Sequence, residues 1–151
     1  MRWVINLLVA VSVGYSLSIV INASVSASTL VGFGIEVSLS DRLDMISKDW
    51  VGLGTIYLPL YLILHAICFW LLGLVLRNRA VTTVIARVTY AVIGALSLMA
   101  FYLSFDAVMG SGGVVVASTR TMAGLFAHAA TGAVSGFLFQ FLNHGPNSQS
   151  D

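Results

Sequence analysis

Four long stretches that are nearly free of charged side chains constrain this chain more than any other feature. Each holds about twenty or more mostly apolar residues, and together they cover residues 3–22, 51–76, 88–108 and 121–142. An α-helix rises 1.5 Å per residue, so about twenty residues cross a hydrocarbon core about 30 Å thick. Because lipid offers no hydrogen bonds, each crossing segment must pair its own backbone, as a helix does. The sequence therefore predicts an all-α, polytopic membrane protein with four transmembrane helices.

The scarcity of charge supports a lipid environment. Only 9% of the residues are charged and 58% are hydrophobic, whereas a soluble domain carries about a quarter charged residues. The net charge of +1 leaves no basic stripe to neutralise phosphates, which argues against a nucleic-acid partner. The single cysteine, Cys68, has no partner for a disulfide bond within the chain.

The first apolar stretch raises the alternative of a cleaved signal peptide. A basic start, an apolar run and the small residues of "ASVSA" (23–27) resemble such a segment. The apolar run is about 19 residues long, however, whereas a signal peptide uses about 7–15. We therefore expect an uncleaved first helix, one transmembrane domain over residues 1–143, and a disordered polar tail over residues 144–151.

The distribution of arginine and lysine predicts the orientation. Arg77, Arg79 and Arg87 lie in or beside the short link between the second and third spans, and Arg2 lies at the amino terminus. The other side carries three basic residues together with most of the acidic ones. Because short cytoplasmic loops are enriched in Lys and Arg, we expect a multi-pass protein of a bacterial inner membrane with both termini in the cytoplasm.

A short amphipathic helix is predicted on the periplasmic side, between the first two spans. Apolar residues recur at helical spacing in "SDRLDMISKDW" (40–50), where Ser40 can cap the helix and Asp44 and Lys48 form a favourable i,i+4 pair. Such a helix is expected in the headgroup region with its apolar stripe toward the lipid.

The start of the second span depends on Pro59. If the helix begins near Val51, the proline removes a backbone hydrogen bond and bends the helix. If the helix begins near Thr55, the proline falls in or near the first turn, where it costs little. Gly32 and Gly34 permit turns before the amphipathic segment.

The segment "SLSDRLDMISKDWVGLGTIYLPLYLIL" (38–64) combines an acidic amphipathic turn with "GLG" and the start of a helix. It resembles a stretch in small, uncharacterised four-helix inner-membrane proteins of proteobacteria. That resemblance implies a location in the inner membrane and this layout of helices. It implies no activity.

Two histidines lie within the predicted spans, where polar side chains are costly and often functional. His65 is near the middle of the second span and His128 somewhat outside the middle of the fourth, about five residues or roughly 7 Å apart in depth. One interpretation is a b-type haem held by both imidazoles, with nearby glycines admitting the macrocycle and Arg120 serving one propionate. The other is helix packing, in which Tyr61 can bond to His65 one turn away.

Small residues surround His128 in the fourth span. Gly124, Gly132 and Gly136 stand at multiples of four residues, so they share with His128 a face about 120° wide. Lipid is as apolar as leucine, and membrane helices therefore associate through close backbone approach and a few hydrogen bonds. We expect this glycine ridge to be an interface, either within the chain or with a partner subunit.

Other classes of function have less support. Carriers usually place carboxylates or arginines inside the bundle, and none lies in a predicted core. A small channel, or a carrier that relays protons through His65 and His128, is the third hypothesis. No HExxH, GxSxG or Walker motif occurs, so no catalytic or metal-binding residue is predicted. Asp106 and Arg120 flank the loop before the fourth span and can pair near the periplasmic headgroups.

The polar residues of the first span, serines 12, 16 and 18 with Tyr15, are interpreted as ordinary contacts between helices. The sequence thus favours an accessory or structural subunit of a membrane assembly, which acts through contacts with itself or with another membrane subunit. A haem-bearing electron-transfer subunit is the alternative. Without haem, no cofactor is expected.

Overall fold

The computed structural model describes residues 1–109 and 117–144, and the regular secondary structure of this part of the chain is all helical. It consists of α1 (Arg2–Gly32), α2 (Leu39–Gly54), α3 (Tyr57–Leu76), α4 (Thr83–Met109), the short 3-10 helix η1 (Ala117–Arg120) and α5 (Met122–Asn143). Four of these helices, α1, α3, α4 and α5, are long and apolar enough to cross a membrane. The prediction of an all-helical chain with four such helices is confirmed.

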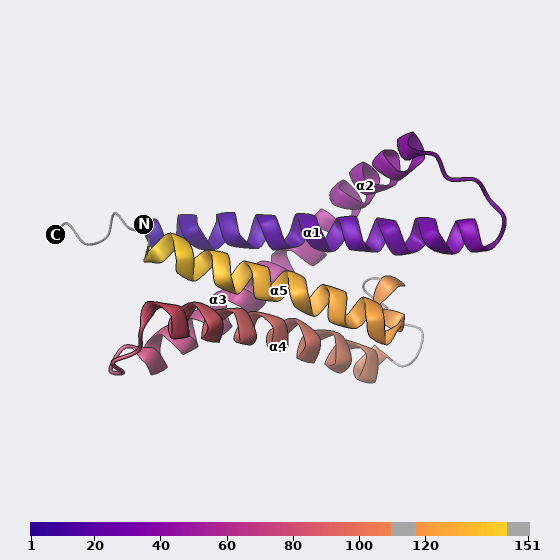
Figure 1. Ribbon diagram of the computed structural model, residues 1–151. Coiled ribbons are helices and arrows are strands. Elements are labelled where there is room, and N and C mark those ends of the chain that lie inside the picture. The colour runs from indigo at the N-terminus through magenta and orange to yellow at the C-terminus, as the bar shows by residue number, and fades with distance from the viewer. Residues whose placement is uncertain (110–116, 145–151) are drawn as a thin grey trace.

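The four apolar helices form a bundle with alternating directions. α1 and α4 run one way and α3 and α5 the other (Figure 1). The start of α1 and the end of α5 meet where the Asn6 side-chain amide donates to Asn143 Oδ1 over 3.0 Å. We call this the arginine end, because Arg2, Arg77, Arg79 and Arg87 lie near it, and the opposite side the far end.

α1 continues ten residues beyond the predicted span 3–22, to Gly32. The extension is rich in serine, and its hydroxyls stay within the helix: Ser24 donates to the carbonyl of Val20, and Ser28 to that of Ser24. A serine whose hydroxyl bonds to the carbonyl four residues earlier is compatible with a continuing helix. α1 therefore projects past the other helices at the far end (Figure 1).

α2 follows a turn at Gly34, whose φ of 80° suits glycine. The predicted amphipathic helix exists, but its cap is Ser38 and not Ser40. Ser38 and Asp41 form a reciprocal capping box, and these hydrogen bonds lower the pKa of the Asp41 carboxyl. The predicted pair of Asp44 and Lys48 is present at 2.7 Å and raises the pKa of the Lys48 ammonium.

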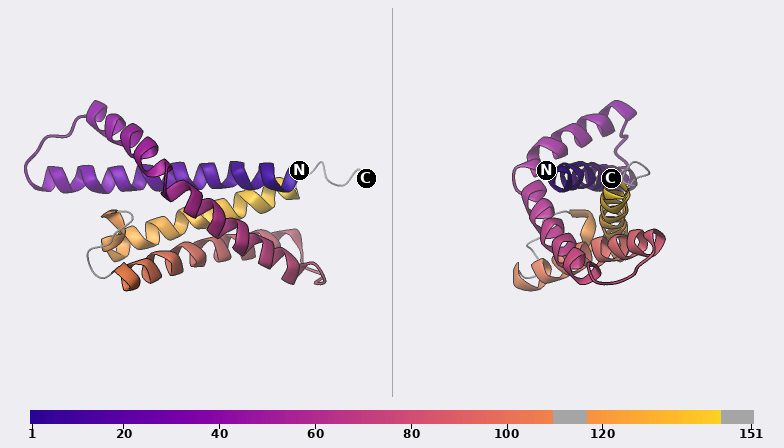
Figure 2. Two further views of the ribbon diagram at one scale, coloured as in Figure 1. Left: turned by 180° about the vertical axis from the view of Figure 1, so that it is seen from behind. Right: turned by 90° about the vertical axis from the view of Figure 1, so that its left-hand side faces the viewer.

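α2 and α3 are separated by a short break at Thr55 and Ile56, so the second apolar span begins at Tyr57 rather than Val51. In an unbroken helix the N–H of residue 59 would donate to the carbonyl of Thr55, and Pro59 has no N–H. The proline therefore falls in the first turn of α3. The chain bends at this break: α2 and α3 overlap along one line in the left view of Figure 2 but meet at a clear angle in the right view, and α3 crosses the rest of the bundle diagonally.

α4 and α5 are in direct backbone contact through glycines. A Cβ on Gly132 would overlap the carbonyl of Gly94, and a Cβ on Gly94 would overlap that of Gly132. One turn along, a Cβ on Gly136 would overlap the carbonyl of Tyr90. Approach this close is the main source of attraction between helices in lipid. The glycine ridge predicted from the sequence is thus used inside the chain.

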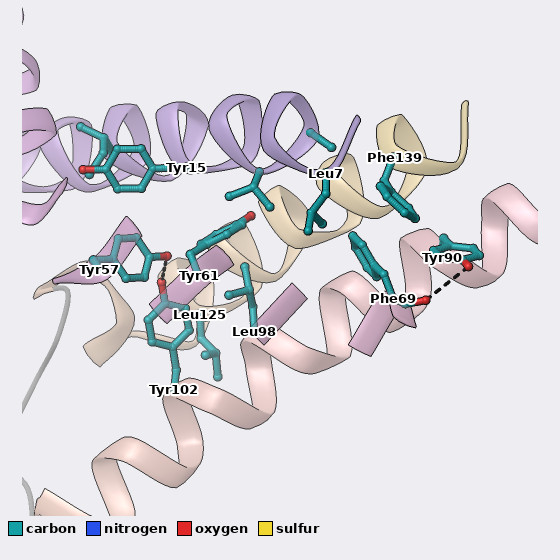
Figure 3. Packing of buried hydrophobic residues seen from close by; sticks show 13 residues of the cluster. Leu7, Tyr15, Tyr57, Tyr61, Phe69, Tyr90, Leu98, Tyr102, Leu125 and Phe139 are labelled. Carbon is teal, nitrogen blue, oxygen red and sulfur yellow. Dashed lines mark hydrogen bonds between the residues drawn. The ribbon is translucent and has the colours of Figure 1, made fainter. Parts of the chain in front are cut away.

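Aromatic side chains fill the space between this pair and the other helices (Figure 3). Phe69 of α3 stacks on Phe139 of α5, with ring centroids 5.0 Å apart, and meets Tyr90 of α4 edge-on at 5.5 Å. Every buried residue of α3 belongs to one stripe at four-residue spacing: Tyr57, Tyr61, His65 and Phe69. α3 is therefore attached by a single face.

We expect Gly132→Ala to destabilise the bundle strongly. The added methyl group meets backbone atoms of α4, which cannot rotate away, so the helices must separate. Overpacking of this kind costs about 1–3 kcal/mol. The thermal midpoint of the purified protein in detergent should fall by several degrees. Gly52→Ala is the control, because a Cβ on Gly52 in α2 has open space and alanine favours a helix; equal midpoints for the two variants would contradict the packing.

Candidate functional site

His128 lies on α5 in the interior of the bundle and has no exposed surface. Its ring nitrogens each meet a serine hydroxyl: Nδ1 is 2.7 Å from Ser18 Oγ on α1, and Nε2 is 2.6 Å from Ser118 Oγ in η1. A neutral imidazole has one donor and one acceptor nitrogen, and a hydroxyl serves in either role. Both nitrogens are therefore satisfied in either tautomer, without a charged partner.

A chain of hydroxyl groups leads on from Ser18. Its Oγ lies 3.0 Å from the hydroxyl of Tyr57 on α3, which hydrogen-bonds in turn to the hydroxyl of Tyr102 on α4 (Figure 3). We call Ser18, Tyr57, Tyr102, Ser118 and His128 the His128 network. Each of the four apolar helices and η1 contributes one side chain, so the network fixes their relative depth.

The chemistry of the network suits a buried position. Its members need no ionised form to make these hydrogen bonds, so the bundle avoids the large desolvation cost of a buried charge. Each hydroxyl, and the imidazole in its neutral form, has a single donor hydrogen, so every hydrogen bond of the network uses the donor of one of its two members. Loss of one member removes a hydrogen bond from each of its neighbours, and a buried group left without any partner costs about 1–3 kcal/mol.

Asn22 of α1 connects the network to the far end. Its side-chain nitrogen donates to Asp49 Oδ2 of α2 over 2.9 Å, and its oxygen accepts from the Ser118 N–H over 3.4 Å. Nearby, the Tyr15 hydroxyl donates to the Trp50 carbonyl over 2.7 Å. The indole N–H of Trp50 donates to Ser16 Oγ over 3.3 Å, so the last turns of α2 are attached to α1 by three hydrogen bonds.

A second polar cluster lies next to the network, on the side toward the arginine end. The Tyr61 hydroxyl of α3 is 3.0 Å from Ser135 Oγ and 3.4 Å from Thr131 Oγ1, both on α5. Thr131 also donates to the carbonyl of His128 over 2.8 Å. The cluster attaches α3 to α5 through Tyr61, which lies one turn beyond Tyr57 along α3.

His65, the other histidine singled out by the sequence, is also completely buried. Its Nδ1 donates to the backbone carbonyl of Tyr61 over 2.9 Å, and its ring stacks on that of Tyr61 with centroids 4.3 Å apart. Tyr61 is therefore the local partner of His65, as expected, and the hydrogen bond is to the backbone carbonyl of Tyr61 rather than to its phenol. Nε2 of His65 has no hydrogen-bond partner among the described residues.

The arrangement does not fit a haem between the two histidines. Both nitrogens of His128 are engaged by serines. His65 lies eight residues beyond Tyr57 along α3, about 12 Å at the helical rise, and the ring of Tyr61 lies between these levels. Of the glycines expected to admit a macrocycle, Gly132 and Gly136 lie against the backbone of α4 and Gly124 against that of η1. The two imidazoles are therefore not brought to one cofactor.

The four residues predicted as an interface all face the inside of the chain. Gly132 and Gly136 contact α4, His128 belongs to the network, and a Cβ on Gly124 would overlap the carbonyl of Ser118 in η1. The predicted pair of Asp106 and Arg120 falls on side chains outside the described part of the structure, as does most of the predicted tail, residues 145–151. Within the described residues, no three His, Cys, Asp or Glu side chains converge on a metal position.

Several residues of the site were missed by sequence reasoning. Ser118 belongs to a short segment, "ASTR", without any periodicity that marks a buried position. Asn22 stands at the end of the first predicted span, and no local pattern in the sequence pairs it with Asp49. One signal was present: the four-residue spacing of Tyr57, Tyr61, His65 and Phe69 predicts a buried aromatic face.

We expect Ser18→Ala to lower the stability of the bundle by about 1–3 kcal/mol, because it leaves Nδ1 of His128 without a partner and removes one of the two partners of the Tyr57 hydroxyl. Thermal unfolding in detergent measures the effect. Ser12→Ala, on the exposed side of the same helix, is the matched control and should stay near the wild type. Non-additivity with Tyr57→Phe would show that the two residues act as a unit; simple additivity would rule the network out as one.

Comparisons with known proteins complete the description of the site. No family model, no curated protein and no solved structure matches this chain. The assignment of function therefore starts from its own residues: the buried His128 network, the internal glycine contact and the surfaces that these leave uncovered.

Proposed function

We propose that this chain is an accessory or structural subunit of an assembly in a bacterial inner membrane. In this proposal it crosses the membrane four times, with the arginine end in the cytoplasm and α2 at the periplasmic surface. The support for a membrane location is the set of four long apolar helices. The resemblance of residues 38–64 to proteobacterial inner-membrane proteins agrees with this location.

The charges at the two ends of the bundle support the orientation. Arg77 and Arg79 are exposed in the link between α3 and α4, where the described residues carry no acid. The far end has Lys48 paired with Asp44 and an acidic capping box at Ser38 and Asp41. The end whose described link carries two arginines and no acid is the one that the positive-inside rule assigns to the cytoplasm.

The open face of α3 is the observation that carries the proposed function. α3 contacts the bundle through its buried aromatic stripe and through partly buried neighbours such as Leu62 and Leu72, while its opposite side stays exposed and apolar. The large exposed residues there are Leu60, Ile63, Ile67, Trp70, Leu71, Leu74 and Val75. The glycine ridge is already used inside the chain, and α3 is the least buried of the four spans. Of the four spans, α3 therefore has the most surface left uncovered for a partner subunit.

A photo-crosslinking amino acid at Ile67 of α3 tests the proposed contact in native membranes. Ile67 is 53% exposed, and Val92 on α4, at 48%, is the matched control. We expect a discrete protein adduct from Ile67 and only lipid adducts from Val92. A second copy with a different tag distinguishes self-association from another subunit. Lipid adducts alone at both positions would remove the proposed function.

The orientation has its own test. In a Cys68→Ser background, we expect the new cysteine of Asp44→Cys to react with a membrane-impermeant maleimide in cells whose outer membrane is permeable. The cysteine of Arg79→Cys should react only after the inner membrane is opened, because the two residues lie at opposite ends of the bundle. Equal labelling of both from outside would overturn the four-span topology.

A further inference from the structure

The arginine end carries positive charge without a described counter-ion. Arg77 and Arg79 lie in the link that follows α3, and Arg87 lies in the second turn of α4. The described segments that meet at this end, residues 1–8, 70–88 and 140–144, contain no Asp or Glu. The only ion pair between described side chains that the structure gives is Lys48 with Asp44, at the far end. The arginines therefore have no carboxylate partner in these segments.

Arg87 is the most constrained member of the group. Its Nε is buried and has no hydrogen-bond partner among the described residues. The guanidinium carbon lies 4.9 Å from the ring centroid of Phe141 on α5, so the planar group is held over an aromatic face. A guanidinium that is partly withdrawn from water and lacks an acceptor favours an anion with several oxygens.

The surroundings of Arg87 are apolar and exposed. Val84 and Val88 flank it on α4, with 67% and 54% of their surface exposed. Phe141 is stacked on Phe137, and both rings are also exposed on α5. A free anion in water gains nothing from such neighbours. A lipid gains from both, because its phosphate meets the arginine while its acyl chains cover the valines and phenylalanines.

We propose that Arg87, with Arg77 and Arg79, binds the phosphate of an anionic phospholipid whose acyl chains lie along the outer side of α4 and α5. Arg87 supplies a planar fork that bonds two phosphate oxygens. The two exposed arginines of the link add charge, which selects an anionic headgroup over a zwitterionic one. This site is independent of the contact proposed for α3, since it lies on different helices.

The full chain in a neutral detergent tests this site by native mass spectrometry with defined lipids. We expect phosphatidylglycerol to be retained in preference to phosphatidylcholine of the same acyl chains. Arg87→Gln should reduce phosphatidylglycerol retention about tenfold, as the loss of a charge-assisted hydrogen bond predicts. Arg42→Gln, which removes a partly exposed arginine at the far end, should leave it unchanged. Equal retention of the two lipids by the wild type would overturn the proposal.

Further variants and probes separate a specific site from general charge attraction. Arg87→Lys keeps the charge but loses Nε and the planar fork, so we expect phosphatidylglycerol retention between those of the wild type and Arg87→Gln. Inorganic phosphate at the same concentration should not compete, because it lacks acyl chains. Competition by phosphate alone, wild-type retention by Arg87→Gln or Arg87→Lys, or an equal loss in Arg42→Gln would each contradict a phospholipid site at Arg87.

Discussion

The backbone contact between α4 and α5 is the interaction on which the rest of this structure depends. In lipid, burial of leucine between helices gains little over leaving it in contact with acyl chains, so association needs close approach. Gly94 and Gly132 make that approach possible only together, since a Cβ on either residue would meet the other's carbonyl. The resulting pair is a rigid surface, and the remaining helices are arranged on it.

The His128 network determines how α1 and α3 are placed on this surface. Apolar packing between helices tolerates small slides along their axes, whereas a hydrogen bond of 2.7 Å does not. Ser18 on α1 and Tyr57 on α3 meet at one point beside His128, so each helix is held at one depth. The network thus sets the positions of α1 and α3 along their axes, while the glycine contact brings α4 and α5 close together.

The two features leave an uneven surface. α5 is the most buried of the four apolar helices, whereas α3 is fully buried along one stripe only and α4 has an apolar outer side. Both open surfaces are compatible with lipid, and on the α4 and α5 side the partly buried guanidinium of Arg87 lies over Phe141. This held guanidinium suits the α4 and α5 side to a phospholipid, whereas the apolar side of α3 suits another helix.

Much of the fold could be predicted from the sequence, because the requirement to span a bilayer acts on length and composition alone. The glycines of α5 were also visible as a ridge around His128. Their partner was not, since Gly94 is a lone glycine in an apolar run and nothing local marks it as a contact. Ser118 was missed for a related reason: its burial depends on η1 folding back toward α1 and α5, which no periodic pattern encodes.

The position of η1 has a consequence for how this chain tolerates change in length. Connections between membrane helices usually accept insertions, because they are solvated tethers. Here the turn just before α5 is itself an internal part, with its serine on His128 and its carbonyl against Gly124. An epitope or fluorescent protein inserted directly before α5 would displace η1 from the interior. The exposed turn around Phe33 and Gly34 should accept the same insertion without disturbing the bundle.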